Sequence, residues 1–170
     1  IVLTETNLHE QVVLPAVAAR KHIFVEKPLG FASPDATRMS GAIQASGVRF
    51  STGYFQRGEP INQFLRTQLA AGAFGKLTRI RKSNCHAGAL KGWFDTDWRW
   101  MTDPAVAGCG AFGDLGTHAL DIVMWWMEAL GVKEAKACGS VLGTLTGRYG
   151  KVDEYGEGLL RFANGTAATI

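Results

Sequence analysis

Residues 1–54 alternate short apolar runs with segments whose apolar residues recur at helical spacing. The pattern predicts buried parallel strands at 1–4, 23–25 and 48–54, and helices at 9–20 and 34–46. Pro15 is expected to destabilise or kink the first helix, because proline lacks the backbone N–H that a helix interior uses. Ser33 is the expected N-cap of the second helix, and Gly47 is the residue expected to close it. Strand, helix, strand, helix, strand is typical of a parallel sheet with right-handed crossovers.

From residue 54 onward the pattern indicates a different architecture. The predicted elements are a helix at 59–72, a basic-faced strand at 75–86, a loop-rich stretch at 87–113, a helix at 114–130, and strands at 132–145, 154–163 and 166–170. Asn164 and Gly165 form a hairpin signal between the last two strands. The predicted fold class is therefore α/β plus α+β, with a parallel sheet in 1–53 and a mostly antiparallel open sheet in 54–170.

Composition narrows the classes of protein further. Of the 170 residues 46% are hydrophobic, enough for a sizeable core, and a net charge of +3 gives no case for nucleic-acid binding. The longest strongly apolar stretch, Ile122–Met127, is far shorter than the ~20 residues of a membrane span, and we find no signal-peptide pattern. Three cysteines without a CxxC pair favour a reducing compartment, so we expect a cytoplasmic protein.

The string Glu26-Lys27-Pro28 directly follows the second predicted strand. Ligands of open α/β sheets bind outside the carboxyl ends of the strands, and a desolvated lysine in that place is suited to proton transfer. Pro28 fixes the turn and is compatible with a cis bond. An ordinary surface lysine after a strand is the alternative that three residues alone leave open.

A glycine-rich segment at 108–121 matches the dinucleotide pattern GxGxxG at its start. We reject that interpretation because the fingerprint follows a strand, and 103–107 is a poor strand. The segment instead predicts a glycine turn that opens a helix. One stripe of this helix carries polar and aromatic residues: Asp114, His118, Asp121 and Trp125. The neighbouring stripe is apolar, so we expect it to face the hydrophobic core.

Asp114 and His118 lie one helical turn apart, so they can share a proton or hold one hydroxyl group, and histidine titrates near neutral pH. The alternative is that Asp114 caps the helix and His118 is a satisfied core residue. Further upstream, Trp93, Trp98 and Arg99 belong to a segment that interleaves aromatic and charged residues. Such a segment can stack on a sugar and bind its hydroxyls, or form an aromatic mini-core.

A metal site is a further alternative. Its spacing fits no familiar zinc pattern, and HExxH is absent, so we expect no metal. The residues that it would use are Cys85, His86, Cys109, Asp114, His118 and Asp121.

Together these segments resemble the Gfo/Idh/MocA family of NAD(P)-dependent oxidoreductases, which includes glucose-fructose oxidoreductase and inositol dehydrogenase. The matching stretches follow the family's order and span nearly the whole chain: TETNLH at 4–9, KHIFVEKPL at 21–29, GAFGKL at 72–77, and Gly108–Asp121. Glu5 stands where the family usually has proline, so that loop is expected to differ in shape.

The resemblance implies that 1–53 is the C-terminal portion of a Rossmann dinucleotide-binding domain and that 54–170 is an incomplete α+β domain for substrate binding and oligomerisation. The family transfers a hydride between NAD or NADP and a hydroxyl-bearing carbon, usually of a sugar or polyol. Lys27 then lies beside nicotinamide and substrate, while Asp114 and His118 bind substrate and relay the hydroxyl proton. The residues expected near the nicotinamide are Thr4, Thr6, His9, Glu26 and Lys27.

The family's GxGxxG turn belongs to earlier strands, so we expect the chain to be the central piece of a longer enzyme and inactive alone. We expect a sugar or polyol as substrate, a homo-oligomer (dimer or tetramer) through the C-terminal sheet, and neither a nucleic-acid nor a membrane partner. Two other functions stay open: a non-catalytic oligomerisation or binding homologue, and a metal-dependent hydrolase, which is less favoured.

Overall fold

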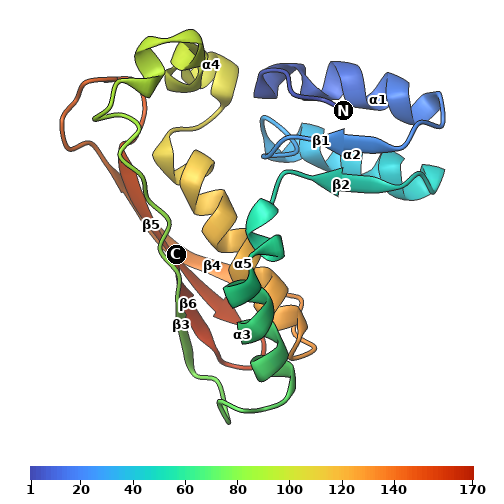
Figure 1. Ribbon diagram of the computed structural model, residues 1–170, viewed down its shortest axis with the longest axis vertical. Coiled ribbons are helices and arrows are strands. Elements are labelled where there is room, and N and C mark those ends of the chain that lie inside the picture. The colour runs from blue at the N-terminus through green and yellow to red at the C-terminus, as the bar shows by residue number, and fades with distance from the viewer.

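The computed structural model describes residues 1–170, which form two separate sheets (Figure 1). The elements of the first part are a 3₁₀ turn (Thr6–Leu8), α1 (His9–Ala18), β1 (Ile23–Val25), α2 (Ser33–Ser46) and β2 (Phe50–Thr52). β1 and β2 pair in parallel. The predicted strand at 1–4 is wrong in extent: only Val2 bridges to Val25, because the chain turns away into the 3₁₀ turn after Glu5.

One apolar core joins α1, α2 and the first sheet; its residues are Val2, Val13, Val17, Ile23, Val25, Met39 and Ile43. α2 begins one residue earlier than predicted, with Ala32 rather than Ser33 as N-cap. The Asp35 carboxylate accepts the backbone N–H groups of Phe31 at 2.6 Å and of Ala32 at 2.7 Å, so an acidic first-turn residue holds the start of the helix. Gly47, with φ of +68°, closes it as predicted.

The second part is a four-stranded sheet with helices on one face. Its helical elements are a 3₁₀ turn (Phe55–Gly58), α3 (Pro60–Ala70), 3₁₀ turns at Trp93–Asp95 and Asp97–Thr102, α4 (Pro104–Ala107), a π-helical turn (Phe112–Gly116) and α5 (Thr117–Glu128). Its strands are β3 (Arg79–Arg81), β4 (Ala135–Gly143), β5 (Tyr155–Phe162) and β6 (Ala167–Thr169). Their order across the sheet is β3-β6-β5-β4, and only β3 and β6 pair in parallel. The predicted fold class is confirmed.

The core of the second part lies between the sheet and helices α3 and α5 (Figure 1). It consists of Leu69, Ile80, Ile122, Val123, Trp126, Met127, Leu160, Phe162 and Ala168. Alternation along β5 turns Leu160 and Phe162 inward and leaves Leu159 and Arg161 exposed on the opposite face. That face carries no helix, and the homo-oligomer expected through this sheet stays a prediction.

The predicted strand at 75–86 is correct in its alternation but wrong in its length. Ile80 is buried between the exposed Arg79 and Arg81, as the pattern indicates. Pairing stops after Arg81 because the neighbouring strand β6 ends at Thr169. Residues 82–86 therefore run on without a regular ladder.

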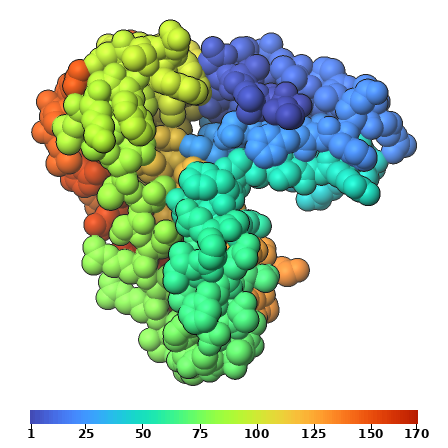
Figure 2. All heavy atoms as spheres, viewed as in Figure 1, coloured from blue at the N-terminus to red at the C-terminus, as the bar shows by residue number.

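The chain passes from the first part to the second only once, between β2 and the turn at Phe55–Gly58. In Figure 2 residues 1–53, coloured blue to cyan, project sideways from the larger part and leave a re-entrant angle beneath them. α4 contacts the turn at Thr6–Leu8, and the turn at Phe55–Gly58 contacts α5. None of the helices combines the length and apolar character that crossing a membrane requires.

Replacing Ile122, which is fully buried in the core of the second part, should be costly. We expect Ile122→Ala to lower the free energy of unfolding by about 2–5 kcal/mol, because it removes buried methylene groups and leaves a cavity. Urea denaturation followed by circular dichroism measures this loss. Leu120→Ala on the exposed side of the same helix is the matched control, and an equal loss in both variants would contradict the assignment of the core.

Candidate active site

Lys27 stands just after β1 and reaches across to the second part of the chain. Its Nζ forms an ion pair with the Asp114 carboxylate and donates a hydrogen bond to the Asp114 carbonyl oxygen at 3.1 Å. The two side chains are only 15% and 18% exposed. The Lys27–Pro28 peptide is cis, and the Lys27 backbone N–H donates to Glu26 Oε2 at 3.1 Å. Two residues that the sequence analysis places on separate elements thus share one site.

The position of Asp114 depends on the π-helical turn that precedes α5. The Asp153 carboxylate accepts the backbone N–H of Phe112 at 2.7 Å, and the Asp153 carbonyl oxygen accepts that of Ala111 at 3.0 Å. These two bonds satisfy donors at the start of the turn that have no partner within it. Asp153 therefore anchors the turn from the loop before β5.

Glycine is required where the turn packs most tightly. A Cβ atom on Gly113 would collide with the Cys109 side chain, so only a residue without a side chain fits. Gly108 ends α4 with φ of +79°, so a short helix and not a strand comes directly before it. The rejection of a dinucleotide fingerprint here is consistent with that local structure, and such π-helical turns are frequent at functional sites.

His118 lies in the first turn of α5 and is only 6% exposed. The rings of Tyr54 and Phe55 pack edge-on against its imidazole, with centroids at 5.8 and 5.2 Å. The Tyr54 hydroxyl hydrogen bonds Thr117 Oγ1 at 2.7 Å, which fixes the neighbouring ring. His118 Nδ1 is buried and has no hydrogen-bond partner. A buried polar nitrogen without a partner is a candidate for contact with a ligand.

Burial lowers the pKa of His118 below its ordinary value of 6.5, and the Lys27 cation lowers this pKa further. The carboxylates of Asp114, Asp121 and Glu26 act in the opposite direction without reversing the shift. Near pH 7 the imidazole is therefore neutral and able to accept a proton.

Asp121, one turn after His118, is held by Arg57. The guanidinium donates to both carboxylate oxygens, with Nε at 2.7 Å, and the Asp121 side chain is only 8% exposed. The same guanidinium lies 5.9 Å from the Trp125 ring centroid, and that of Arg66 lies 4.7 Å from it. Arg57 thus balances the negative charge of Asp121, which by itself raises the pKa of His118.

His9 connects the first loop to the loop that follows β1. Its Nδ1 lies 3.1 Å from the carbonyl oxygens of Pro28 and Leu29, and its Nε2 lies 3.3 Å from that of Thr4. His9 and Thr6 are both buried, while the buried Thr4 Oγ1 has no partner. Thr4 thus has an unpartnered polar atom in the loop that His9 ties to the segment after Lys27, whereas the ring nitrogens of His9 already face the backbone.

An aromatic cavity of about 220 Å³ opens beside Asp114. It is lined by His86, Trp93, Phe94, Trp98, Met101 and Asp114. A narrower hollow of about 90 Å³ adjoins it and shares His86, Phe94, Met101 and Asp114. The predicted substrate residues Trp93 and Trp98 therefore lie at the same site as Asp114.

Arg99 does not line this cavity. Its guanidinium donates to Asp95 Oδ1 at 3.1 Å and stacks over Tyr149 at 5.3 Å from the ring centroid. Asp95 also pairs with Arg148, and Tyr149 packs edge-on against Phe94 at 5.7 Å. The charged residues of the tryptophan-rich segment thus fasten it to the loop before β5, which sequence spacing alone does not indicate.

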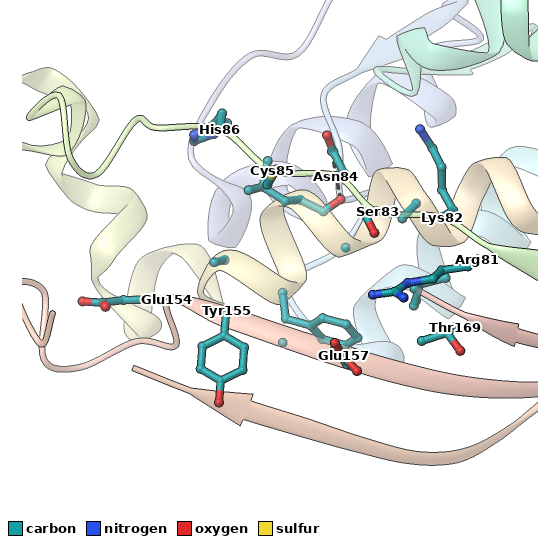
Figure 3. A pocket seen from close by; sticks show the side chains of 17 residues that line it. Arg81, Lys82, Ser83, Asn84, Cys85, His86, Glu154, Tyr155, Glu157 and Thr169 are labelled. Atoms are coloured by element: carbon teal, nitrogen blue, oxygen red, sulfur yellow. Dashed lines mark hydrogen bonds between the residues drawn. The ribbon is translucent and has the colours of Figure 1, made fainter. Parts of the chain in front are cut away.

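A larger hollow of about 270 Å³ lies between residues 81–86 and the beginning of β5 (Figure 3). The α5 end of this hollow is closed by a hydrogen bond from the Asn84 amide to the Leu115 carbonyl oxygen at 3.1 Å. Lys27, Asp114 and His118 do not line it. We therefore place the candidate active site around Lys27 and Asp114, beside the smaller aromatic cavity that Asp114 lines.

The six candidate metal ligands do not come together: no group of three or more His, Cys, Asp and Glu residues in the chain is arranged to hold a metal ion. Cys109 is a poor nucleophile, because burial raises the pKa of its thiol to about 11. Lys27, Asp114 and His118 are the remaining candidate reactive groups.

Three residues near the site were missed in the sequence analysis as parts of it. Tyr54 and Phe55 follow β2 just as Lys27 follows β1, and the rule that ligands bind beyond the carboxyl ends of strands could have identified them. His86 lines the aromatic cavity from a segment that the alternation assigns to a strand. No local signal points to it.

The two sheets and the charged cluster between them define a two-part α/β plus α+β protein with reactive groups at the junction. Residues 62–170 match the family model of the GFO/IDH/MocA C-terminal domain, and residues 1–54 match that of the oxidoreductase family with an NAD-binding Rossmann fold. The chain belongs to the Gfo/Idh/MocA family, so the resemblance is confirmed.

Among curated relatives, levoglucosan dehydrogenase of Pseudarthrobacter phenanthrenivorans is 24% identical over 99% of this chain and 47% of that protein. A solved levoglucosan dehydrogenase in complex with NADH and levoglucosan has a TM-score of 0.84 at 25% identity, covering 99% of this chain and 45% of that one. An inositol dehydrogenase homolog complexed with NAD+ from Azotobacter vinelandii has a TM-score of 0.85 at 20% identity, covering 98% and 43%. The chain spans about half the length of the curated relatives that it matches.

Changing either partner of the Arg57–Asp121 pair should move the pKa of His118 in opposite directions. Arg57→Gln leaves the Asp121 carboxylate uncompensated and should raise that pKa, whereas Asp121→Asn removes the negative charge and should lower it. Titration of the His118 ring by NMR measures both shifts. Arg66→Gln, which removes the other guanidinium at Trp125, is the control, and shifts of the same sign in the two test variants would refute the electrostatic account.

Proposed function

We propose that this chain carries the reaction centre of an oxidoreductase that transfers a hydride between NAD or NADP and a secondary hydroxyl or carbonyl group of a sugar or polyol. The cluster of Lys27, Asp114 and His118 beyond the carboxyl end of β1 carries this proposal, because open α/β sheets bind their ligands there. Two relatives, a levoglucosan dehydrogenase and a myo-inositol 2-dehydrogenase, support the substrate class. We infer that 1–53 serves the cofactor and 54–170 the substrate.

The residues around Lys27 fit the nicotinamide end of a dinucleotide. The unpartnered Thr4 Oγ1 is a buried polar atom without another role, and the residues that would hold this end are Thr4, Thr6, Glu26 and Lys27. His9 would position them, since its ring nitrogens face backbone carbonyl groups. When bound, the cofactor supplies the hydride acceptor or donor.

Oxidation of a secondary alcohol also requires a base for the hydroxyl proton. His118 is neutral near pH 7 because burial and Lys27 lower its pKa, so its imidazole takes the proton as the C–H hydride leaves. The Lys27 ammonium group stabilises the developing alkoxide, and Asp114 orients that ammonium group. In the reverse direction His118 returns the proton to the carbonyl oxygen.

The proposal predicts a specific loss in His118→Asn. With NAD+ or NADP+ and a panel of sugars and polyols, we expect the full-length gene product to turn over at least one, and the variant to lose about 10²–10⁴-fold in kcat, because general-base catalysis is worth that much. The wild-type rate of oxidation should rise with pH to a plateau, with a midpoint below 6.5.

His22→Gln is the matched control, since His22 is an exposed histidine that binds only a backbone N–H group. Unchanged kcat in His118→Asn, or no turnover with either cofactor across the panel, would count against the proposal. Steady-state kinetics between pH 5 and 9 provide both readouts.

A further inference from the structure

We propose that the aromatic cavity beside Asp114 accepts an electrically neutral ring, such as a pyranose, an anhydrosugar or a cyclitol, and excludes rings that bear a phosphate or carboxylate group. This rests on the proposed function and specifies its substrate. It also assigns a contact with the ring to His86, which no feature of the sequence indicates.

The lining of the cavity is aromatic and unusually accessible. Trp93 and Trp98 are 49% and 57% exposed, and the ring of His86 lies 5.2 Å from that of Trp93 at a 40° tilt. Large aromatic side chains that served only as a mini-core would bury these surfaces. Their exposed faces beside Asp114 instead match the C–H face of a sugar ring, which leaves ring hydroxyls free to reach the carboxylate.

The charges around the cavity determine which substituents on the ring it can accept. Asp114 lines both hollows, Asp153 and Glu154 line only the narrower one, and no lysine or arginine lines either. Backbone N–H groups of Thr146 and Leu145 lower the pKa of Glu154 to about 2, so this group is ionised throughout the physiological range. Lys27 balances the charge of Asp114, so Asp153 and Glu154 leave the two adjoining hollows with an excess of negative charge that disfavours an anionic substituent.

The nearest arginines are already engaged elsewhere. Arg99 and Arg148 both pair with Asp95, and their guanidinium groups stack over Tyr149 at 5.3 and 5.5 Å from the ring centroid. Arg148 also donates to the Ala89 carbonyl oxygen at 3.2 Å. Both guanidinium groups are thus directed toward Asp95 and Tyr149, and neither lines the two hollows, although arginine is the usual phosphate ligand in proteins.

A matched pair of ligands tests the exclusion directly. Isothermal titration calorimetry of the full-length gene product, with and without NADH, would compare glucose with glucose 6-phosphate, and myo-inositol and levoglucosan would serve as further neutral rings. We expect at least one neutral ring to bind, and the phosphorylated ring to bind at least about tenfold more weakly than glucose. Equal or tighter binding of glucose 6-phosphate, or binding of no neutral ring, would overturn the proposal.

Two variants test the residues. Trp98→Ala should weaken binding of the neutral ring about tenfold and Trp98→Phe should retain most of it, because a stacking surface remains. Met101→Arg should tighten binding of glucose 6-phosphate about tenfold by placing a cation among the carboxylates, and Met101→Leu is its control. If Met101→Arg folds, as judged by circular dichroism, and gains no affinity, charge does not govern the selection.

A third variant separates this inference from the proposed function. His118→Asn should lower kcat about 10²–10⁴-fold and leave binding of the neutral ring within a fewfold of wild type, since His118 would meet only the reacting hydroxyl and does not line the aromatic cavity. Neutral rings that bind as expected but are never oxidised would refute the proposed function and leave the cavity assignment intact. Oxidation of phosphorylated rings in preference to neutral ones would refute the cavity assignment alone.

Discussion

The ion pair between Lys27 and Asp114 is the interaction on which the rest of the site depends. It joins the carboxyl end of β1 to the turn that opens α5, and both side chains are largely withdrawn from water. Removing one partner of a fully buried pair costs about 3–5 kcal/mol, because the other charge loses its compensation; the partial exposure here reduces that figure. The contact fixes how the two parts meet and also sets the field in which His118 titrates.

Opposing effects of burial and neighbouring charges set the pKa of His118. Burial by Tyr54 and Phe55 and the charge of Lys27 disfavour its protonated form, while three carboxylates favour it. Burial is the largest of these effects, so the balance falls toward the neutral imidazole. Asp114, one of these carboxylates, also lines the adjoining aromatic cavity, so proton transfer and the choice of ligand share one charged group.

Much of this site could be predicted from the sequence because it follows general rules. Lys27 was found from its place beyond a buried strand, and Asp114 and His118 from helical spacing, although a π-helical turn rather than regular α-helix holds Asp114. Long-range strand pairing could not be predicted. The strand expected at 75–86 pairs only over Arg79–Arg81, because its partner β6 is short. Arg99 pairs with Asp95 at i,i+4 spacing, whereas the pairing of Asp95 with Arg148 joins distant segments and is encoded by no local pattern.

The turn from Tyr54 to Arg57 is the only covalent path between the two parts, and it is hydrogen bonded to α5 at Thr117 and at Asp121. A flexible linker would let the two parts sample many separations, so the local concentration of one beside the other would be low. Here the connection is short and fastened on both sides of His118. Lys27 is consequently presented to Asp114 at a high effective concentration, and the two charges meet as an intramolecular event with little orientational entropy left to lose.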